Sequence, residues 1–213
     1  MLKTYDGSNY YAKINAIMHY TKEKFIPSSK TRAFTLAMIE HFKENNITNV
    51  IGCEIGVDKG FNAINMIHML EKNNITVDNL ILVDPYTTWV EFIKNKRVEQ
   101  DYSSHKTVAR KRLMKYNGKY TFIFRDSKDA VEYVRSHLPS CGAHFIYIDG
   151  CHTHEGVKSD INKYYPLVIK NGVMGGHDFC AHWQGVSRAV LEFVDEHNLK
   201  LFGSNIDWWV VKY

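Results

Sequence analysis

Short apolar runs alternate with amphipathic stretches along most of this chain. Four runs rich in β-branched and aromatic residues each end at a polar turn, as buried strands of a parallel sheet do. They cover residues 49–54, 80–83, 120–124 and 145–148. Two further β-prone runs, 199–203 and 207–213, close the chain. Between the runs, apolar residues recur at helical spacing. Strands alternating with helices predict an α/β fold with a doubly wound, mostly parallel sheet.

The helices expected between these strands differ in how clearly they are marked. Four segments have a plain apolar face: residues 31–43, 61–72, 128–137 and 186–197. A fifth is expected over residues 155–170, with Asn171-Gly172 as its stop and a second short strand starting at Val173. Residues 86–116 are longer than a crossover needs and carry many charges, so we expect one or two helices there. Part of them forms a lid, or they present a solvated helical face; the sequence leaves both open.

The amino-terminal segment is the hardest part to interpret. Residues 10–20 are compatible with a short helix, and Pro27 interrupts the pattern after it. We expect residues 1–48 to form a helical cap or arm on one globular domain of residues 49–213. Trp208 and Trp209 near the other end are expected to pack in the core.

Acidic and imidazole side chains gather after two of the predicted strands. Asp149 and His152 follow the strand at 145–148, and His177 and Asp178 follow the next one. Carboxyl ends of neighbouring parallel strands meet at one edge of the sheet. Two carboxylates with imidazoles can hold a divalent cation and move a proton. The sequence therefore predicts a divalent-cation site here, with Asp149 and Asp178 as ligands and His177 or water completing the shell.

Three alternatives at this edge stay open on the sequence alone. His154 competes with His152 as a base. His152 itself also suits a cap of the following helix or a metal ligand that takes no part in proton transfer. The pattern C-H-x-H together with H-D-F-C-x-H, which includes Cys151 and Cys180, also permits a zinc cluster, although it lacks the repeated pairs of structural zinc sites.

A glycine turn follows the first strand. It reads E-I-G-V-D-K-G, in which Gly56 permits a tight turn and Gly60 permits close approach of a ligand at a helix amino terminus. Asp84 ends the second strand, where a carboxylate can accept hydrogen bonds from a ribose diol; a turn-forming role before Pro85 is the alternative. Asp126 and Ser127 end the third strand and also suit a helix N-cap.

Composition narrows the classes of protein. The net charge is +4, with 45% hydrophobic and 23% charged residues, which describes an ordinary globular chain. No apolar run approaches a membrane span and no signal core opens the chain, so we expect a cytoplasmic protein with no membrane partner. Charge this mild and dispersed gives no reason to expect a nucleic-acid partner. Cys53 is expected to be a small core residue.

The motifs together resemble a known family. I-D-G-x-H-x-x-E-G-V-x-x-D, followed by N-G-V and G-G-H-D, is similar to the class I methyltransferases that use S-adenosylmethionine (SAM), and within them to the metal-dependent O-methyltransferases of macrolide sugars and rhamnose. The resemblance implies a Rossmann-like seven-stranded sheet with an antiparallel carboxyl-terminal strand. It also implies that Mg²⁺ or Mn²⁺ is bound.

The same resemblance implies roles for particular residues. The turn bearing Glu54, Gly56 and Gly60 would hold the methionine part of SAM, and Asp84 the ribose. Asp126 and Ser127 would lie near the adenine. Asp149 would serve both cofactor and metal.

His152, at the D-x-x-H spacing of the family, would be the general base. His177 stands where the macrolide-sugar enzymes have a metal-binding glutamate. The imidazole of His152 is largely neutral at pH 7 and can accept a proton.

The sequence thus predicts a SAM-dependent, metal-assisted O-methyltransferase whose acceptor is a saccharide or glycoside. A catechol-type or other phenol O-methyltransferase is the rival with the same fold and donor. A SAM-fold binding module without catalysis is the rival from another class, and the intact set of acidic and glycine residues speaks against it. Relatives are often fused to glycosyltransferases, so the chain is also compatible with one module of a longer protein.

Overall fold

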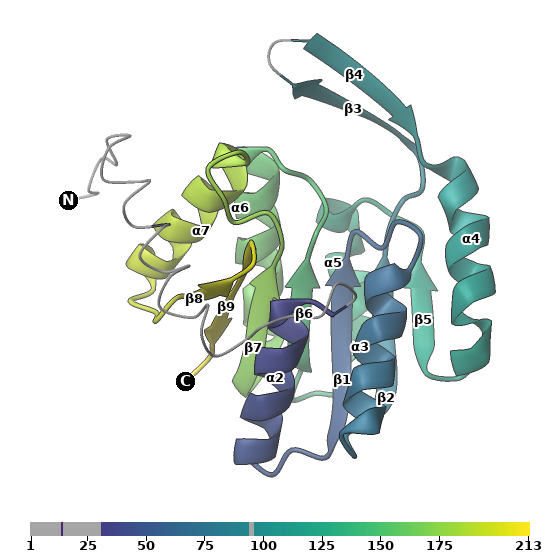
Figure 1. Ribbon diagram of the computed structural model, residues 1–213, viewed down its shortest axis with the longest axis vertical. Coiled ribbons are helices and arrows are strands. Elements are labelled where there is room, and N and C mark those ends of the chain that lie inside the picture. Colours follow the sequence, from purple (N-terminus) through teal and green to yellow (C-terminus); the bar gives the residue numbers. More distant parts are fainter. Residues whose placement is uncertain (1–13, 15–30, 94–95) are drawn as a thin grey trace.

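A seven-stranded sheet forms the centre of the computed structural model, which describes residues 14, 31–93 and 96–213. The strand order is β5-β2-β1-β6-β7-β9-β8 (Figure 1). The strands are β1 (Asn49–Ile55), β2 (Thr76–Val83), β5 (Tyr120–Ile123), β6 (Ala143–Ile148), β7 (Val168–Gly176), β8 (Phe202–Ser204) and β9 (Asp207–Val211). Neighbours among the first five are parallel, and β9 is antiparallel to β7. The predicted doubly wound, mostly parallel sheet is confirmed.

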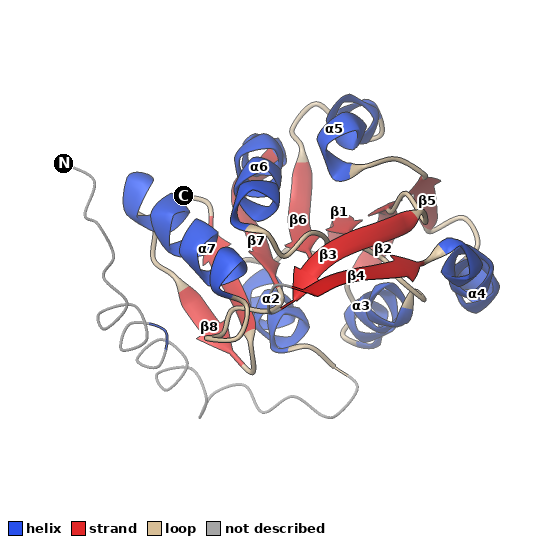
Figure 2. Ribbon diagram, turned by 90° about the horizontal axis from the view of Figure 1, so that it is seen from above, coloured by secondary structure: helices blue, strands red, loops and turns tan. Residues whose placement is uncertain are grey.

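Helices cover both faces of the sheet, as the view from above shows (Figure 2). On one face lie α2 (Ala33–Glu44), α3 (Phe61–Lys72) and α4 (Ser103–Leu113); on the other lie α5 (Ser127–Ser136), α6 (His154–Tyr164) and α7 (Gln184–Glu196). Successive residues of a strand face opposite layers. In β6, Phe145 and Tyr147 pack in the core beneath α2 and α3, whereas Ile146 and Ile148 pack in the core beneath α6 and α7. Trp208 and Trp209 are buried, as expected.

The helix expected over residues 155–170 is too long. Helix α6 ends at Tyr164, a single 3-10 turn covers Tyr165–Leu167, and β7 starts at Val168. Pro166 explains the early end, since proline lacks the N–H that a continuing helix needs. Asn171, the expected helix stop, instead lies inside β7 with a positive φ of 60°, beside a register shift in the β6–β7 pairing.

The helices expected at the start of residues 86–116 are also wrong in part. Residues there form an antiparallel hairpin of β3 (Thr88–Ile93) and β4 (Lys96–Asp101), and only then do α4 and the 3-10 turn Met114–Tyr116 follow. Threonine, tryptophan, valine and isoleucine favour strands, so the composition of β3 carried this signal. The hairpin rises above the carboxyl ends of the sheet and lies across them (Figures 1 and 2).

A distant carboxylate caps the amino terminus of α2. The buried side chain of Asp207, at the start of β9, accepts a hydrogen bond from the backbone N–H of Phe34 at 3.0 Å and another from the Tyr147 hydroxyl at 2.9 Å. The N-cap residue of α2, Arg32, provides no side-chain cap of its own. Asp207 therefore fixes the end of the helix from which Arg32 projects.

Some sequence predictions cannot be compared with this structure. The helix expected over residues 10–20 lies, apart from Ile14, outside the described residues, and the division of the chain at residue 48 stays a prediction. Among the helices that are described, none is long and apolar enough to cross a bilayer.

Candidate active site

A cleft of about 1000 Å³ opens at the carboxyl ends of the parallel strands. Nearly all of the site residues expected from the sequence line it: Glu54, Gly56, Asp84, Asp126, Ser127, Asp149, His152, His177 and Asp178. Gly60 is the exception. It is the N-cap of α3, with a φ of 74°, and a β-carbon there would lie 3.4 Å from Ala109 of α4 rather than in the cleft.

The glycine turn after β1 passes directly against the turn after β6. Gly56 has a φ of 83°, and a β-carbon on it would lie 2.1 Å from the carbonyl oxygen of Asp149. Such a distance is far below van der Waals contact, so only glycine fits here. Glycine thus lets the two turns pack directly against each other, and both turns line the cleft.

Asp84 holds this turn in place. Its Oδ2 accepts hydrogen bonds from the backbone N–H groups of Val57 at 2.9 Å and Asp58 at 3.0 Å, and its Oδ1 accepts one from Tyr86 at 2.8 Å. Burial raises the pKa of this carboxyl, and the three hydrogen bonds oppose that rise. Asp84 is therefore the anchor of the loop. The bond from Tyr86 is the turn-forming role that the sequence left open, whereas the bonds from Val57 and Asp58 were not expected.

Glu54 is a buried acid with an unpaired oxygen. Its Oε1 accepts a hydrogen bond from Nδ2 of Asn62 at 2.9 Å, while its Oε2 has no partner among the described residues. Burial raises its pKa to about 8. Because a buried oxygen without a partner is costly, this arrangement suits a ligand that brings a hydrogen-bond donor to Oε2.

Asp149, His152 and Asp178 form the polar centre of the cleft. Each places one ligand atom within 4.8 Å of those of the others, and the described residues contain no cysteine in such a group, which disfavours the zinc alternative. His152 Nε2 lies 3.0 Å from Asp178 Oδ2. His177 Nδ1 lies 3.0 Å from Asp178 Oδ1 and 3.7 Å from Asp149 Oδ1. All four predicted residues are thus brought together.

The electrostatics of the two acids differ. Burial alone would raise the pKa of Asp178, but hydrogen bonds from His152 and His177 hold it well below its usual range. Burial raises the pKa of Asp149, although His177 and Arg32 oppose the rise. The ligand atoms that lie together are those of two carboxylates and one imidazole, that of His152; His177 lies beside them and is not in this group. Such a donor set fits a divalent cation, and its carboxylate oxygens suit Mg²⁺ and Mn²⁺.

Arg32 is a residue of this site that the sequence did not reveal. Its Nη2 lies 3.4 Å from Asp149 Oδ2, and its side chain is about one-third exposed (34%). The two residues are 117 positions apart. Only the packing of α2 on the sheet brings them together, so no local signal could have predicted the contact.

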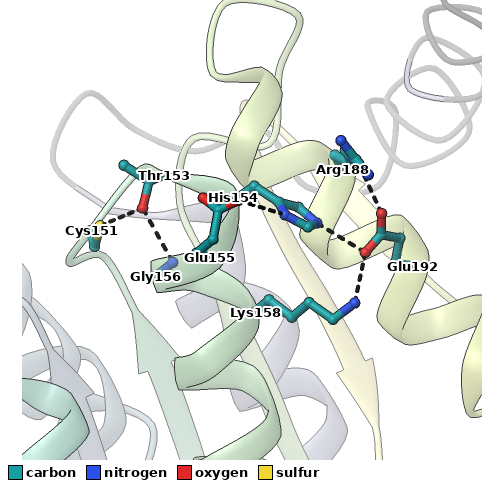
Figure 3. A network of polar contacts seen from close by, with 8 residues as sticks. All are labelled: Cys151, Thr153, His154, Glu155, Gly156, Lys158, Arg188 and Glu192. Atoms are coloured by element: carbon teal, nitrogen blue, oxygen red, sulfur yellow. Dashed lines mark hydrogen bonds and ion pairs between the residues drawn. The ribbon is translucent and has the colours of Figure 1, made fainter. Parts of the chain in front are cut away.

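The two candidate bases occupy different surroundings. The ring of His152 lines the cleft and lies 4.4 Å, centroid to centroid, from the ring of Trp183. His154 instead lies outside the cleft lining, with Nε2 2.9 Å from Oε2 of Glu192 on α7 (Figure 3). Lys158 and Arg188 share that carboxylate. This placement favours His152 over His154 as the base.

One face of the β3–β4 hairpin lines the outer part of the cleft. Trp89 of β3 and Gln100 of β4 line it, together with Thr87 just before β3 and Tyr102 just after β4. Trp89 and Gln100 are direct partners across the hairpin, so their side chains share a face. The outer space thus has aromatic and amide surfaces.

The sequence model of a protein family described as "Methyltransferase domain" matches residues 53–179, more than half of the chain. The chain therefore belongs to this methyltransferase family. No curated protein matches it significantly.

Solved structures share the fold along nearly the whole chain. The calicheamicin methyltransferase CalS11 is 12% identical with a TM-score of 0.61, covering 98% of this chain and 94% of its own. The O-methyltransferase NovP is 14% identical with a TM-score of 0.62, covering 97% and 99%. An O-methyltransferase from Bacillus cereus, solved with S-adenosylhomocysteine (SAH), is 13% identical with a TM-score of 0.58, covering 100% and 94%. The fold is that of SAM-dependent O-methyltransferases.

Proposed function

We propose that this methyltransferase transfers the methyl group of SAM to a hydroxyl of a saccharide or glycoside, with a divalent cation at the acceptor. The observation that carries the proposal is the position of His152. Its imidazole faces the same cleft as the glycine turn and lies within 4.8 Å of two candidate metal-binding carboxylates. A base, a cation site and a donor cradle at one place are what alkylation of a weakly acidic hydroxyl requires.

The donor fits the inner part of the cleft. SAM would be held by the turn at Gly56, by Glu54, whose unpaired Oε2 suits the α-ammonium group, and by Asp84 and the Asp126-Ser127 turn. Bound there, SAM supplies a methyl group already activated by its sulfonium. The protein's contribution is to align the acceptor oxygen with that methyl group and to keep water out.

His152 takes the proton of the acceptor hydroxyl on Nδ1, because Nε2 lies 3.0 Å from Asp178 Oδ2 and donates its own hydrogen to that carboxylate. Hydrogen bonding to Asp178 orients the ring, and Trp183 packs against it. Asp149, Asp178 and His177 would hold the cation, which lowers the pKa of a coordinated hydroxyl. Arg32 adds a fixed positive charge beside Asp149.

The hairpin face is the proposed acceptor site. Aromatic rings that stack on the apolar faces of a pyranose, together with an amide that reaches its hydroxyls, suit a saccharide. Trp89, Tyr102 and Gln100 provide these groups. One of the similar structures is described as a TDP-rhamnose 3'-O-methyltransferase, which supports a sugar acceptor. The same aromatic face would also accept a phenol, which is the second candidate.

A transfer assay with methyl-labelled SAM tests the proposal. The acceptor panel contains nucleotide-linked deoxysugars, simple glycosides and catechols, each assayed with Mn²⁺, with Mg²⁺ and in excess EDTA. We expect label on a sugar, activity with Mg²⁺ or Mn²⁺, and loss of activity in EDTA. Methylation of catechols alone would replace the acceptor class. Full activity in EDTA would remove the cation from the proposal.

A further inference from the structure

Asp160 is a buried acid of the cleft with no role in the chemistry described above. It lies on α6, is only 2% exposed, and lines the cleft. The hydroxyl of Ser127 donates a hydrogen bond to its Oδ1 at 2.6 Å. The backbone carbonyl of Ser127 in turn accepts a hydrogen bond from the Tyr164 hydroxyl at 2.8 Å. Two residues of α6, Asp160 and Tyr164, thus hold the turn after β5 through hydrogen bonds to Ser127.

The second oxygen of Asp160 is available to a ligand. Among the described residues none donates a hydrogen bond to Oδ2, and the atom lies 3.9 Å from where a β-carbon on Gly150 would be. Gly150 itself lines the cleft. Burial raises the pKa of this carboxyl to about 6, while the Ser127 hydroxyl opposes the rise. Above pH 7 the group is therefore an ionised acceptor that is bonded on one side only.

The charges around the cleft indicate which part of SAM reaches Asp160. The amino-acid end of SAM carries an α-ammonium group, for which the unpaired Oε2 of Glu54 is the acceptor proposed above. The methyl group must face His152. The remaining part is the neutral adenosine, which would then extend past Asp84 toward the corner between α5 and α6. Of its base, the exocyclic amino group is the only strong donor.

We propose that Asp160 selects adenine in the donor, with Oδ2 accepting a hydrogen bond from the exocyclic amino group while Ser127 fixes Oδ1. Asp126 is the other carboxylate of this corner, but its side chain is exposed at the rim. A buried acceptor discriminates more strongly than an exposed one, because water cannot replace a missing donor. The inference rests on the proposed use of SAM.

The experiment compares two ligands that differ at this edge of the base: at the 6-position, and at N1, which accepts a hydrogen bond in adenine and donates one in the 6-oxo base. Calorimetry at pH 7.5 measures binding of SAH and of S-inosyl-L-homocysteine, in which a carbonyl oxygen replaces the amino group. In the parent protein that oxygen would face the Asp160 carboxylate, acceptor against acceptor. We expect SAH to bind about 100-fold more tightly than the 6-oxo analogue.

In Asp160→Ala we expect SAH binding to weaken and binding of the analogue to stay the same or improve, so that the ratio falls roughly ten- to a hundredfold. A melting curve checks the fold, and Asp160→Ser serves if the alanine variant does not fold. Equal losses for both ligands would show that Asp160 only supports the turn, and would overturn the proposal. A ratio altered by Asp126→Asn but not by Asp160→Ala would move the role to Asp126. If the parent protein does not bind SAH at all, the proposed use of SAM as the methyl donor is wrong.

Discussion

The inner and outer ends of the cleft are built in different ways. The inner, donor end consists of turns that directly follow β1, β2 and β5, held by short-range backbone hydrogen bonds such as those to Asp84. The outer, acceptor end combines parts from distant places: Arg32 before α2, Trp89 on the hairpin, and Trp183 before α7. The family match at residues 53–179 includes the donor end and Trp89 but neither Arg32 nor Trp183. Part of the acceptor end therefore lies outside the matched region.

If the two ends are separable, loss of His152 should abolish turnover and spare donor binding. His152→Ala removes the proposed base, and general-base loss typically costs ~10²–10⁴ in rate. SAH affinity should stay within a fewfold of the parent. Turnover with an acceptor from the panel and calorimetry with SAH measure the two effects.

His154→Ala is the matched control, since this imidazole pairs with Glu192 outside the cleft. Near-normal turnover in His152→Ala together with an inactive His154→Ala would reverse the assignment.

Gly56 is where the two ends touch, so Gly56→Ala should damage both. The new β-carbon would lie 2.1 Å from the Asp149 carbonyl oxygen. Gly118→Ala is the control, because Gly118 also has a positive φ, 86°, but nothing lies within 4 Å of its β-carbon position. Both variants bear the backbone cost of about 1–2 kcal/mol. Gly56→Ala should lose a further ~1–3 kcal/mol from the clash, measured by urea unfolding. Equal losses would show that the turn yields freely.

Trp89→Ala should weaken the acceptor end alone. Loss of an aromatic platform should raise the acceptor KM roughly 3- to 30-fold, with SAH affinity unchanged. Val90→Ala is the control, because Val90 is 39% exposed and lies outside the cleft lining. An equal rise of KM in both variants would point to the stability of the hairpin rather than to a contact of Trp89.

Glu54 should release a proton when the donor binds. With a folded pKa of about 8, Glu54 is mostly protonated at pH 7. If its carboxylate pairs with the donor's α-ammonium, SAH binding should release close to one proton, measured by calorimetry in buffers of different ionisation enthalpy. Glu54→Gln should abolish the release. A parent protein that releases no proton would exclude this pairing.

The same shift gives a stability test. The pKa of Glu54 is raised above its value of 4.5 in an unstructured chain, so the folded state binds the extra proton. The stabilising effect is complete below about pH 4.5 and is lost as the pH rises through 8. Glu54→Gln should flatten that part of the unfolding free energy against pH.

Local patterns predicted most of the fold and the inner cleft. Glycine and acid at strand ends are local signals, so Gly56, Asp84 and Asp149 were placed correctly in the cleft. The helix expected to run through Pro166 was wrong because apolar periodicity was given more weight than the proline. The hairpin was missed because charged residues between its β-prone ones resembled an exposed helix face.

Other features could not be predicted from local sequence. The contact of Arg32 with Asp149 depends on how α2 packs on the sheet. The Ser127 hydroxyl could have served as a local cap, yet it bonds to Asp160 on another helix. Contacts between residues that are far apart in the sequence leave no periodic pattern in it.

The cap that Asp207 places on α2 has a consequence for biosynthesis. The hydrogen bond joins Phe34 to a residue 173 positions later in the chain. During synthesis the first turn of α2 can therefore be capped, and Arg32 held in the cleft, only after Asp207 near the end of the chain has been added. Nascent chains released before Asp207 would contain almost every active-site residue without the contact that completes their arrangement. The acceptor end is therefore completed only after nearly the whole chain has been synthesised.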